Sequence, residues 1–285
     1  GGAGIYGVAG DVITGGVWNS IWYAISTVLA LSVVGLWFAI PYRRLGLQTV
    51  GEAFTRRFGS NRNQTLTSLC VQTEYLIVDV IEVYVIAGLL TFMTGMSVPM
   101  ATACAVVVLV SYTAFGGLWG AAYTNLIHVA VIMAGLGAVA ILGTSSFGGW
   151  AEVSRAVGEK LALSGRDEGS FWSFAGQGFV PIVAMIFSAV IHTPAASIYA
   201  NFSTAARAES QLPRTFVIAG LAAALMPLLA GIIGVLTLAR YGTAKGLSGY
   251  AIITTFATET SPWLGGLAVA AILAAVVSTG GPILL

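Results

Sequence analysis

The stretch 216-FVIAGLAAALMPLLAGIIGVLTLA-239 contains 24 residues and no charged side chain. The hydrocarbon core of a bilayer is about 30 Å thick and is crossed by a helix of roughly 20 apolar residues. This stretch alone therefore predicts a transmembrane helix. The rest of the chain agrees, because 57% of its 285 residues are hydrophobic and 8% are charged, whereas about 25% of the residues of a soluble domain are charged.

Six further apolar runs are long enough to cross a bilayer, and a short apolar piece, Gly1 to Gly10, precedes them. These runs are too long and too uniformly apolar for the alternating strands of a membrane barrel, which need about ten residues each. We therefore predict an all-α membrane protein with seven full spans and one partial span. Besides the run quoted above, the spans are Thr14 to Ile40, Gln64 to Phe92, Val98 to Phe115, Tyr123 to Leu142, Gly176 to Tyr199 and Trp263 to Leu285.

The charge balance excludes partners that need a strongly charged face. Twelve Lys and Arg against 11 Asp and Glu give a net charge of +1, which offers no basic surface for nucleic acid. The two cysteines are too few for a disulfide framework. We expect membrane lipid and small molecules as partners, no nucleic acid, and a multi-pass location in the cell (plasma) membrane. The sequence does not indicate an oligomeric state.

The chain reads as one transmembrane domain, 1–285, and as a fragment of a longer protein. It begins without an initiator Met or the charged region of a signal peptide, and it ends inside an apolar run.

The loops suggest an orientation. Lys and Arg concentrate in cytoplasmic loops of membrane proteins, and loop 41–63 is rich in arginine. We place it in the cytoplasm, with an interfacial helix over Thr49 to Phe58. Loop 143–175 is then extracytoplasmic and contains a short amphipathic helix over Gly148 to Leu163. The arginines of the first loop are Arg43, Arg44, Arg56, Arg57 and Arg62.

Three acidic residues, Glu74, Asp79 and Glu82, interrupt the run Gln64 to Phe92. An ionised side chain near the middle of a membrane helix costs about 2.5–3.5 kcal/mol on insertion scales. At 100° per residue, the three fall within about 140° of one another on the helix. This stripe indicates either a helix packed inside a bundle or a path for a proton or cation, and the residues alone leave both readings open.

His128 and His192 are the two histidines, and both lie in apolar runs. A single histidine in a membrane span is more often a hydrogen-bonded packing residue than a ligand. Neither histidine has the HExxH spacing of a metalloprotease. No Ser/His or metal-ligand spacing points to a hydrolase, so we expect a protein that is not an enzyme.

The last run contains Ser278-Thr279-Gly280-Gly281-Pro282. Either hydroxyl alone is explained by a bond back to a helix carbonyl. Pro282 has no N–H, so the carbonyl of Ser278 loses its helical partner. Two hydroxyls and loosened carbonyls form a set of neutral oxygen atoms that suits Na⁺. We therefore expect an interrupted helix and a sodium site here.

Two other segments predict interrupted helices, namely Ile191-His192-Thr193-Pro194 and the glycine-rich opening, Gly1 to Gly10. Irregular backbone within a membrane is tolerated where it lines a site. Short interrupted spans in corresponding halves of a chain are typical of a transporter binding site. These segments together favour a secondary transporter.

At these residues the chain resembles the sodium/solute symporter family, which includes the proline and the sodium/glucose transporters. The resemblance covers nearly the whole chain in the order and spacing of its spans. Four stretches carry it: Gly4 to Gly10, similar to the glycine-and-tyrosine segment after the break in the first core helix; Arg57-Phe58-Gly59, similar to the end of the first inner loop; Gly116 to His128, similar to the GGL-x-A-x-x-x-T-D-x-x-Q stretch entering the fifth core helix; and Ala274 to Thr279, similar to the paired hydroxyls of the eighth.

The resemblance implies a transporter core of two inverted five-helix repeats, here incomplete, from the second half of core helix 1 through helix 8. It implies a sodium-coupled symporter that imports a small organic solute by alternating access, with Na⁺ as the coupling ion and no other metal. Sodium would bind at the hydroxyls of Ser278 and Thr279 and the carbonyl of Ala275. Candidates for lining the solute site are Tyr6, Ser188, His192 and Thr193.

Two departures from the family pattern keep alternatives open. Asn125 stands where the family has an acid, and His128 where it has a glutamine. An ion path would then consist of Asn125, His128 and the acids Glu74, Asp79 and Glu82. The alternatives are a proton- or metal-coupled transporter that uses these intramembrane acids, and a membrane sensor that keeps the fold without transport.

Overall fold

The computed structural model describes residues 2–59, 61–243 and 249–284, and the regular elements within these ranges are all helical. In this part of the chain, six helical segments are long and apolar enough to cross a membrane, and a further span consists of two helices joined at a bend. These segments correspond one to one with the seven predicted runs. The protein is an all-α, multi-pass membrane protein, as the sequence predicts.

The chain forms two compact units, each with its own hydrophobic core. The first unit contains Gly1–Ile21, Asp79–Phe179 and Leu225–Leu285, and the second contains Trp22–Val78 and Val180–Ala224. Helices α2 (Trp18–Val33), α5 (Asn61–Thr94) and α11 (Leu212–Tyr241) are divided between the two units, and Phe179, the first residue of α9 (Phe179–Ala195), also belongs to the first unit.

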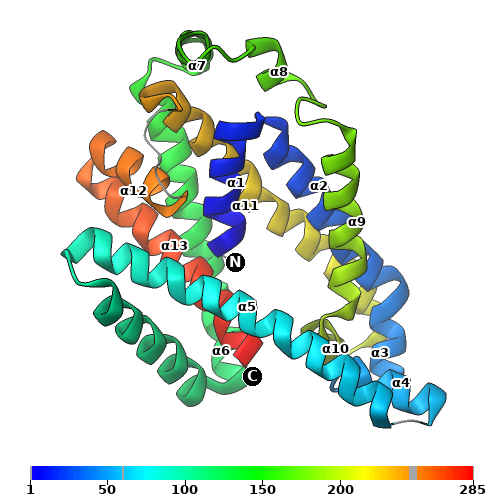
Figure 1. Cartoon of the computed structure of the whole chain (residues 1–285). Coiled ribbons are helices and arrows are strands. Elements are labelled where there is room, and N and C mark those ends of the chain that lie inside the picture. The colour runs from blue at the N-terminus through cyan, green and yellow to red at the C-terminus, as the bar shows by residue number, and fades with distance from the viewer. Residues whose placement is uncertain (1, 60, 244–248, 285) are drawn as a thin grey trace. The chain divides into compact units, whose positions relative to one another are not determined.

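In the first unit, α13 (Pro262–Leu284) lies side by side with α6 (Val98–Ser146) (Figure 1). Close contact depends on glycine. A Cβ atom on Gly135 would lie 2.7 Å from the backbone oxygen of Leu267, so a larger residue would push the two helices apart. The other helices that belong wholly to this unit are α1 (Gly2–Gly15), α7 (Trp150–Leu163), α8 (Glu168–Trp172) and α12 (Gly249–Thr260).

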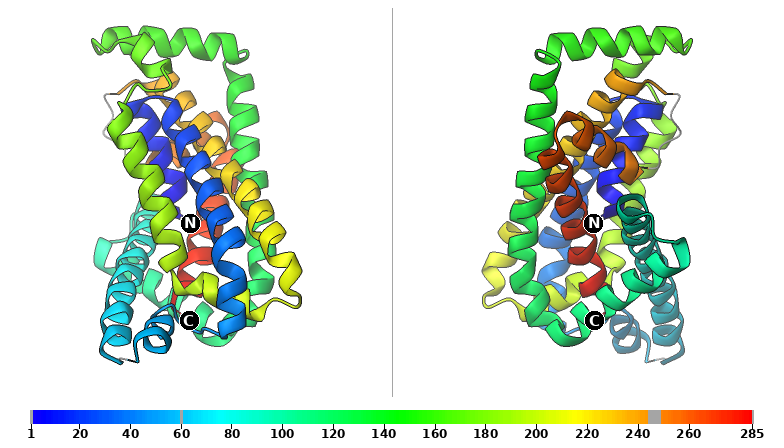
Figure 2. Two further views of the ribbon diagram at one scale, coloured as in Figure 1. Left: turned by 90° about the vertical axis from the view of Figure 1, so that its right-hand side faces the viewer. Right: turned by 90° about the vertical axis from the view of Figure 1, so that its left-hand side faces the viewer.

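Helix α6 contains two of the predicted spans in one run of helical backbone. Its parts Val98–Gly116 and Gly120–Ser146 are each long enough to cross a membrane. The hydroxyls of Tyr112 and Thr124 hydrogen-bond to each other, although 12 residues of straight helix would separate them by about 18 Å. The helix therefore bends strongly between its two parts, and Figure 2 shows its direction changing there.

In the second unit, α2 continues through a π-helical turn, Val34–Phe38, into α3 (Ala39–Leu45). Gly46 ends α3 with a positive φ of 58°, a backbone conformation that favours glycine. Helix α4 (Gly51–Phe58) then covers the segment for which the sequence predicts an interfacial helix. The remaining elements are α9 (Phe179–Ala195), α10 (Ser197–Ala205) and a 3₁₀ turn, Glu209–Gln211.

Helix α3 packs against α10, and Arg43 fixes the contact. Its guanidinium donates to the backbone oxygens of Ser203, Thr204, Ala206 and Arg207. The last carbonyls of a helix have no partner within the helix. Arg43 supplies donors for the end of α10 and for the residues that follow it.

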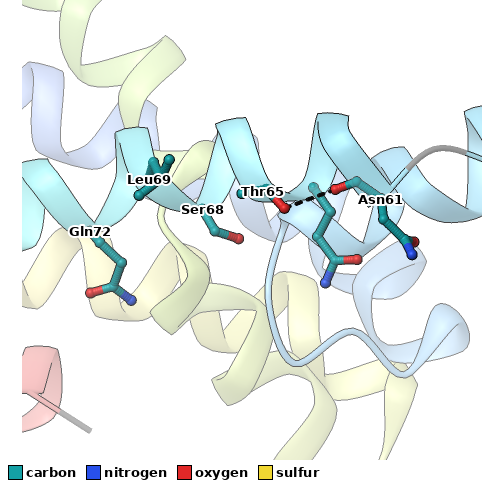
Figure 3. Close-up of a pocket in the computed structure, with 6 residues that line it drawn as sticks. Asn61, Thr65, Ser68, Leu69 and Gln72 are labelled. Carbon is teal, nitrogen blue, oxygen red and sulfur yellow. Dashed lines mark hydrogen bonds between the residues drawn. The ribbon is translucent and has the colours of Figure 1, made fainter.

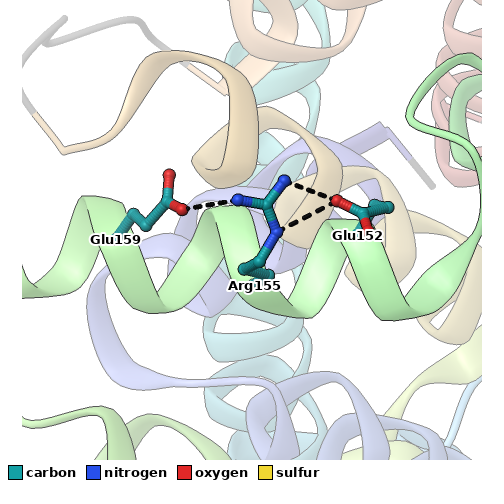
Figure 4. Close-up of polar contacts among 3 residues, drawn as sticks. All are labelled: Glu152, Arg155 and Glu159. Carbon is teal, nitrogen blue, oxygen red and sulfur yellow. Dashed lines mark hydrogen bonds and ion pairs between the residues drawn. The ribbon is translucent and has the colours of Figure 1, made fainter.

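Helix α7 shows the predicted amphipathic pattern. Val153, Val157 and Leu161 are fully buried, and charged residues cover the opposite face. There, Arg155 forms ion pairs with Glu152 and Glu159 (Figure 4). The hydrogen bond and charge of Glu152, together with the charge of Glu159, raise the pKa of the Arg155 guanidinium. The side of the membrane on which α7 lies stays a prediction.

Helix α12 has no counterpart in the predicted elements. Its sequence, GYAIITTFATET, is 12 residues long. The four threonines and the glutamate make the apolar face hard to recognise from the sequence. In the structure Ile253, Phe256 and Ala257 are fully buried. Their spacing of three and four residues is that of one helix face.

Candidate functional site

The expected sodium residues lie on α13 in the first unit. The expected interruption there is wrong, because α13 is continuous from Pro262 to Leu284 and passes through Pro282. The ring of Pro282 removes one backbone hydrogen bond, that of the carbonyl of Ser278, and the described backbone stays helical on both sides of it. A sodium site here would lie on a continuous helix.

Two hydroxyls share one carbonyl on this helix. Ser278 Oγ and Thr279 Oγ1 donate to the backbone oxygen of Ala275 at 2.9 and 3.1 Å. With its proton donated, each hydroxyl oxygen keeps its lone pairs for another partner. Both side chains are half-buried. The carbonyl of Ala275, the third expected sodium ligand, accepts both hydroxyls, and its role in binding sodium stays a prediction.

Helix α1 packs against α13 within the first unit, as a site between the first and eighth core helices requires. The glycine-rich opening forms a continuous helix, Gly2–Gly15, so the expected interruption within Gly1 to Gly10 is also wrong over residues 2–10. The side chain of Tyr6 lies outside the described residues, and its proposed role stays a prediction.

Asn125 and His128 form a pair on α6. Asn125 Oδ1 and His128 Nδ1 are 3.3 Å apart and hydrogen-bonded. The imidazole lies against the ring of Tyr112, with 6.1 Å between ring centroids. Tyr112 in turn contacts α13, since a Cβ atom on Gly281 would be 2.7 Å from its ring. The two departures from the family pattern thus interact with each other beside the C-terminal part of α13.

The acidic stripe of α5 has the predicted orientation. Glu82 is 1% exposed, and Glu74 and Asp79 are partly buried, whereas Leu76 and Val80 on the opposite side are 65% and 60% exposed. The three acids belong to different units, however: Glu74 to the second, Asp79 and Glu82 to the first. Among the described residues, no group of three or more His, Cys, Asp and Glu side chains has the arrangement of a metal site.

The expected interruption near Pro194 is confirmed in the second unit. Helices α9 and α10 form one membrane span that bends by 54° at Ala196. His192 Nε2 hydrogen-bonds to Glu74 Oε1 of α5 and forms an ion pair with it when protonated. Of the other candidate solute residues on α9, Ser188 is exposed, and Thr193 is buried and donates to the carbonyl of Ala189.

Two tyrosines from other helices supply the hydrogen bonds that the bend removes. The hydroxyl of Tyr42, on α3, donates to the carbonyl of Pro194 at 2.5 Å. The hydroxyl of Tyr75, on α5, accepts from the backbone N–H of Ile198 at 3.2 Å. Both tyrosines are at least 91% buried. The sequence offered no signal for either contact, since they join residues 152 and 123 positions apart.

A depression of 320 Å³ follows the polar side of the first part of α5 (Figure 3). One helix supplies all six residues that line it, and the hydroxyl of Thr65 there bonds back to the carbonyl of Asn61. With side chains from one helix only, it has no opposing wall for a solute. The lining residues are Asn61, Gln64, Thr65, Ser68, Leu69 and Gln72.

Comparison with known proteins supports the architecture. The family model of the sodium:solute symporter family matches residues 1–285. The chain belongs to the sodium:solute symporter family. Membership in this family of transporters agrees with the resemblance noted in the sequence.

One relative of the chain is the uncharacterized symporter YwcA of Bacillus subtilis (strain 168). It is 26% identical over 149 residues, which are 51% of this chain and 28% of YwcA. The match thus spans just over a quarter of the length of that relative. No solved structure matches the chain.

Proposed function

We propose that the protein is a sodium-coupled symporter that imports a small organic solute by alternating access. The observation that carries this proposal is the pair of half-buried hydroxyls on α13, with their protons directed to Ala275 and their lone pairs free. Hard cations such as Na⁺ prefer oxygen ligands. Membership in the family and the designation of YwcA as a symporter support the same proposal.

Sodium acts in this proposal by shifting a conformational equilibrium. A bound ion stabilises whichever state of the transporter binds it more tightly, and only by that difference in affinity. Binding at Ser278 and Thr279 would hold α13 against α1, its neighbour in the first unit. This would favour the outward-open state that accepts solute.

The solute is proposed to bind at the bend between α9 and α10. A bend inside a membrane span brings backbone groups and side chains together away from the lipid. At this place the second unit offers the imidazole of His192 and the carboxylate of Glu74. Either can exchange its present partner for a polar group of the solute.

The test is uptake by the full-length protein in proteoliposomes. Labelled probes of four classes, an amino acid, a monosaccharide, a monocarboxylate and a nucleoside, are offered with and without an inward sodium gradient. At least one is expected to accumulate only with the gradient. S278A/T279A should then raise the half-saturating sodium concentration about tenfold or more, because a hydrogen bond or ligand to a charged group contributes about 1.5–3 kcal/mol.

Thr144→Ala is the matched control. The hydroxyl of Thr144, on α6, donates to a carbonyl of its own helix, that of Ala140, at 2.7 Å. Thr144→Ala therefore removes a hydroxyl with the same kind of hydrogen bond at a position outside the proposed sodium site. Unchanged sodium dependence in S278A/T279A would exclude this sodium site. Accumulation driven by a pH gradient without sodium would favour the proton-coupled alternative, and solute binding without flux would favour the sensor.

A further inference from the structure

A buried carboxylate oxygen of α5 lies against α13 in the first unit. Asp79 Oδ1 is inaccessible to solvent, and the residues that the structure describes offer it no hydrogen bond. It is 3.6 Å from the point where a Cβ atom on Gly280 would stand, and the same point is 2.9 Å from a methyl carbon of Leu109. This oxygen therefore lies close to Gly280, and the side chain of Leu109 lies close to the same glycine.

The helices around Asp79 provide no positive charge to balance it. Helices α6 and α13 contain no Lys or Arg, and the one arginine of α5, Arg62, precedes Asp79 by more than four helical turns. The titratable groups near this contact are Tyr112 of α6, with the His128 ring against it, and Glu82 one turn further along α5; α13 has none.

Asp79 as a whole is partly buried, but a carboxylate oxygen that is buried without a donor or a counter-charge disfavours the ionised form and favours uptake of a proton. Ionisable residues inside membrane spans are accordingly rare and tend to mark ion or proton pathways. Water or a nearby cation would restore the ionised form. Asp79 thus has the surroundings of a group that exchanges a proton as its neighbourhood changes.

We propose that Asp79 is a proton-binding site, and that its proton leaves when a monovalent cation binds to the hydroxyls of Ser278 and Thr279 on α13. Gly280, against which the carboxylate lies, directly follows Thr279 in the chain. Coulomb attraction acts over several helix residues in a medium of low dielectric constant, so a cation at Ser278 and Thr279, on the same helix as Gly280, would stabilise the ionised carboxylate. The O–H bond of the protonated Asp79 breaks, the proton passes to water, and one positive charge replaces another.

Linkage makes this effect reciprocal: if sodium weakens proton binding, a proton on Asp79 weakens sodium binding by the same factor. The second half of the proposal rests on the proposed sodium site. The first half, a proton held by Asp79, does not.

The experiment uses infrared difference spectra of the full-length protein in proteoliposomes, with sodium alone as the probe, exchanged against choline at constant ionic strength. In the wild type, sodium should remove a carbonyl band of protonated carboxylic acid. Asp79→Asn should lack this band because an amide cannot titrate. Asp11→Asn makes the same change at an exposed position of α1 and should keep the band.

Binding of radioactive sodium gives the second readout. Acidification should raise the half-saturating sodium concentration of the wild type by about fivefold or more, and should leave that of Asp79→Asn unchanged. If Asp79→Asn keeps the carboxylic acid band and the wild-type pH dependence, the proposal is overturned.

A second variant covers the case in which Asp79→Asn does not fold. Gly280→Ser places a hydroxyl beside Asp79 Oδ1, and the nearest obstacle is the flexible end of Leu109. The new donor favours the carboxylate, so the band should titrate at lower pH than in the wild type, and an unchanged titration would contradict the proposal.

The two proposals fail differently. If no sodium binds, the proposed function fails. A carboxylic acid band that appears on acidification in the wild type and is missing in Asp79→Asn would still support the proton site at Asp79. The presence of this band in both the wild type and Asp79→Asn would overturn the proton site.

Discussion

The span formed by α9 and α10 in the second unit and helix α13 in the first each contain a proline shortly after polar residues, yet they differ in structure. The first pair bends by 54° just after Pro194, whereas α13 passes through Pro282 without interruption. Helix α11 is a third case, because it is continuous through Pro227. A proline is therefore not sufficient to break a membrane helix in this protein.

The difference lies in the neighbours. At the bend, hydroxyls of Tyr42 and Tyr75 replace helical hydrogen bonds of Pro194 and Ile198. Along α13, by contrast, the hydroxyls of the helix bond back to its own carbonyl. Its contact with α6 is made by glycines and apolar side chains. A break is stable in the membrane where other helices supply the missing donors and acceptors.

The largest effect is expected from removing both hydroxyls at the bend. Tyr42→Phe with Tyr75→Phe keeps the rings but leaves a carbonyl and an N–H of α9 and α10 without partners. Each buried unsatisfied group costs about 1–3 kcal/mol. We expect sodium-driven uptake to fall more than tenfold and the thermal unfolding temperature of the purified full-length protein to decrease.

Amide hydrogen exchange separates this effect from a general loss of packing. Exchange should accelerate at Ile198 and its neighbours and not in α13. Tyr84→Phe, at a tyrosine of α5 in the first unit that is 60% exposed, serves as the control and should leave exchange at the bend unchanged. If the double variant has normal uptake and normal exchange at Ile198, the tyrosines do not maintain the break.

An intermediate effect is expected from the prolines themselves. Pro194→Ala restores an N–H to α9 and removes a ring that obstructs the helix, which favours a straighter span. If the neighbours maintain the bend, uptake should fall only several-fold. Pro227→Ala, in the unbroken α11, should change uptake less than twofold. Complete loss of uptake in Pro194→Ala, with the protein still folded, would show that the proline, and not the neighbouring tyrosines, maintains the bend.

The smallest effect concerns the packing that keeps α13 straight. Gly135→Ala would place a methyl group 2.7 Å from the backbone oxygen of Leu267 and 2.8 Å from Cβ of Ala271. Overpacking of this kind costs about 1–3 kcal/mol, so the unfolding temperature should decrease. Gly137→Ala is the matched control on the same helix, since a Cβ atom there meets nothing within 4 Å. Equal stability of the two variants would show that close packing does not matter at Gly135.

The spans were predictable from the sequence because length and hydropathy decide them. All seven predicted runs have a helical counterpart, and the acidic side of α5 was correctly placed by counting 100° per residue. The 12-residue α12 was missed because four threonines and a glutamate interrupt its short apolar sequence. The interruptions of the helices were predicted less well. The interruption near Pro194 was predicted correctly, whereas those at Pro282 and in the glycine-rich opening were not.

What the sequence could not provide is the identity of partners distant in the chain. Glu74 reads as one of three acids on a stripe, yet it hydrogen-bonds to His192, 118 residues away. Asp79 and Glu82 look equivalent to it in the sequence but lie in the first unit. Local rules describe which side of a helix is polar, and tertiary packing decides which group each polar atom meets.

The guanidinium of Arg43 donates to four backbone oxygens at the end of α10 and in the residues after it. That turn of the chain therefore takes its shape from a residue about 160 positions earlier. Replacing the connection between α10 and α11 with the corresponding segment of a homologue would keep its path only if the new backbone presented its oxygens to the same arginine. A chimaera that also exchanged α3 would avoid this restriction.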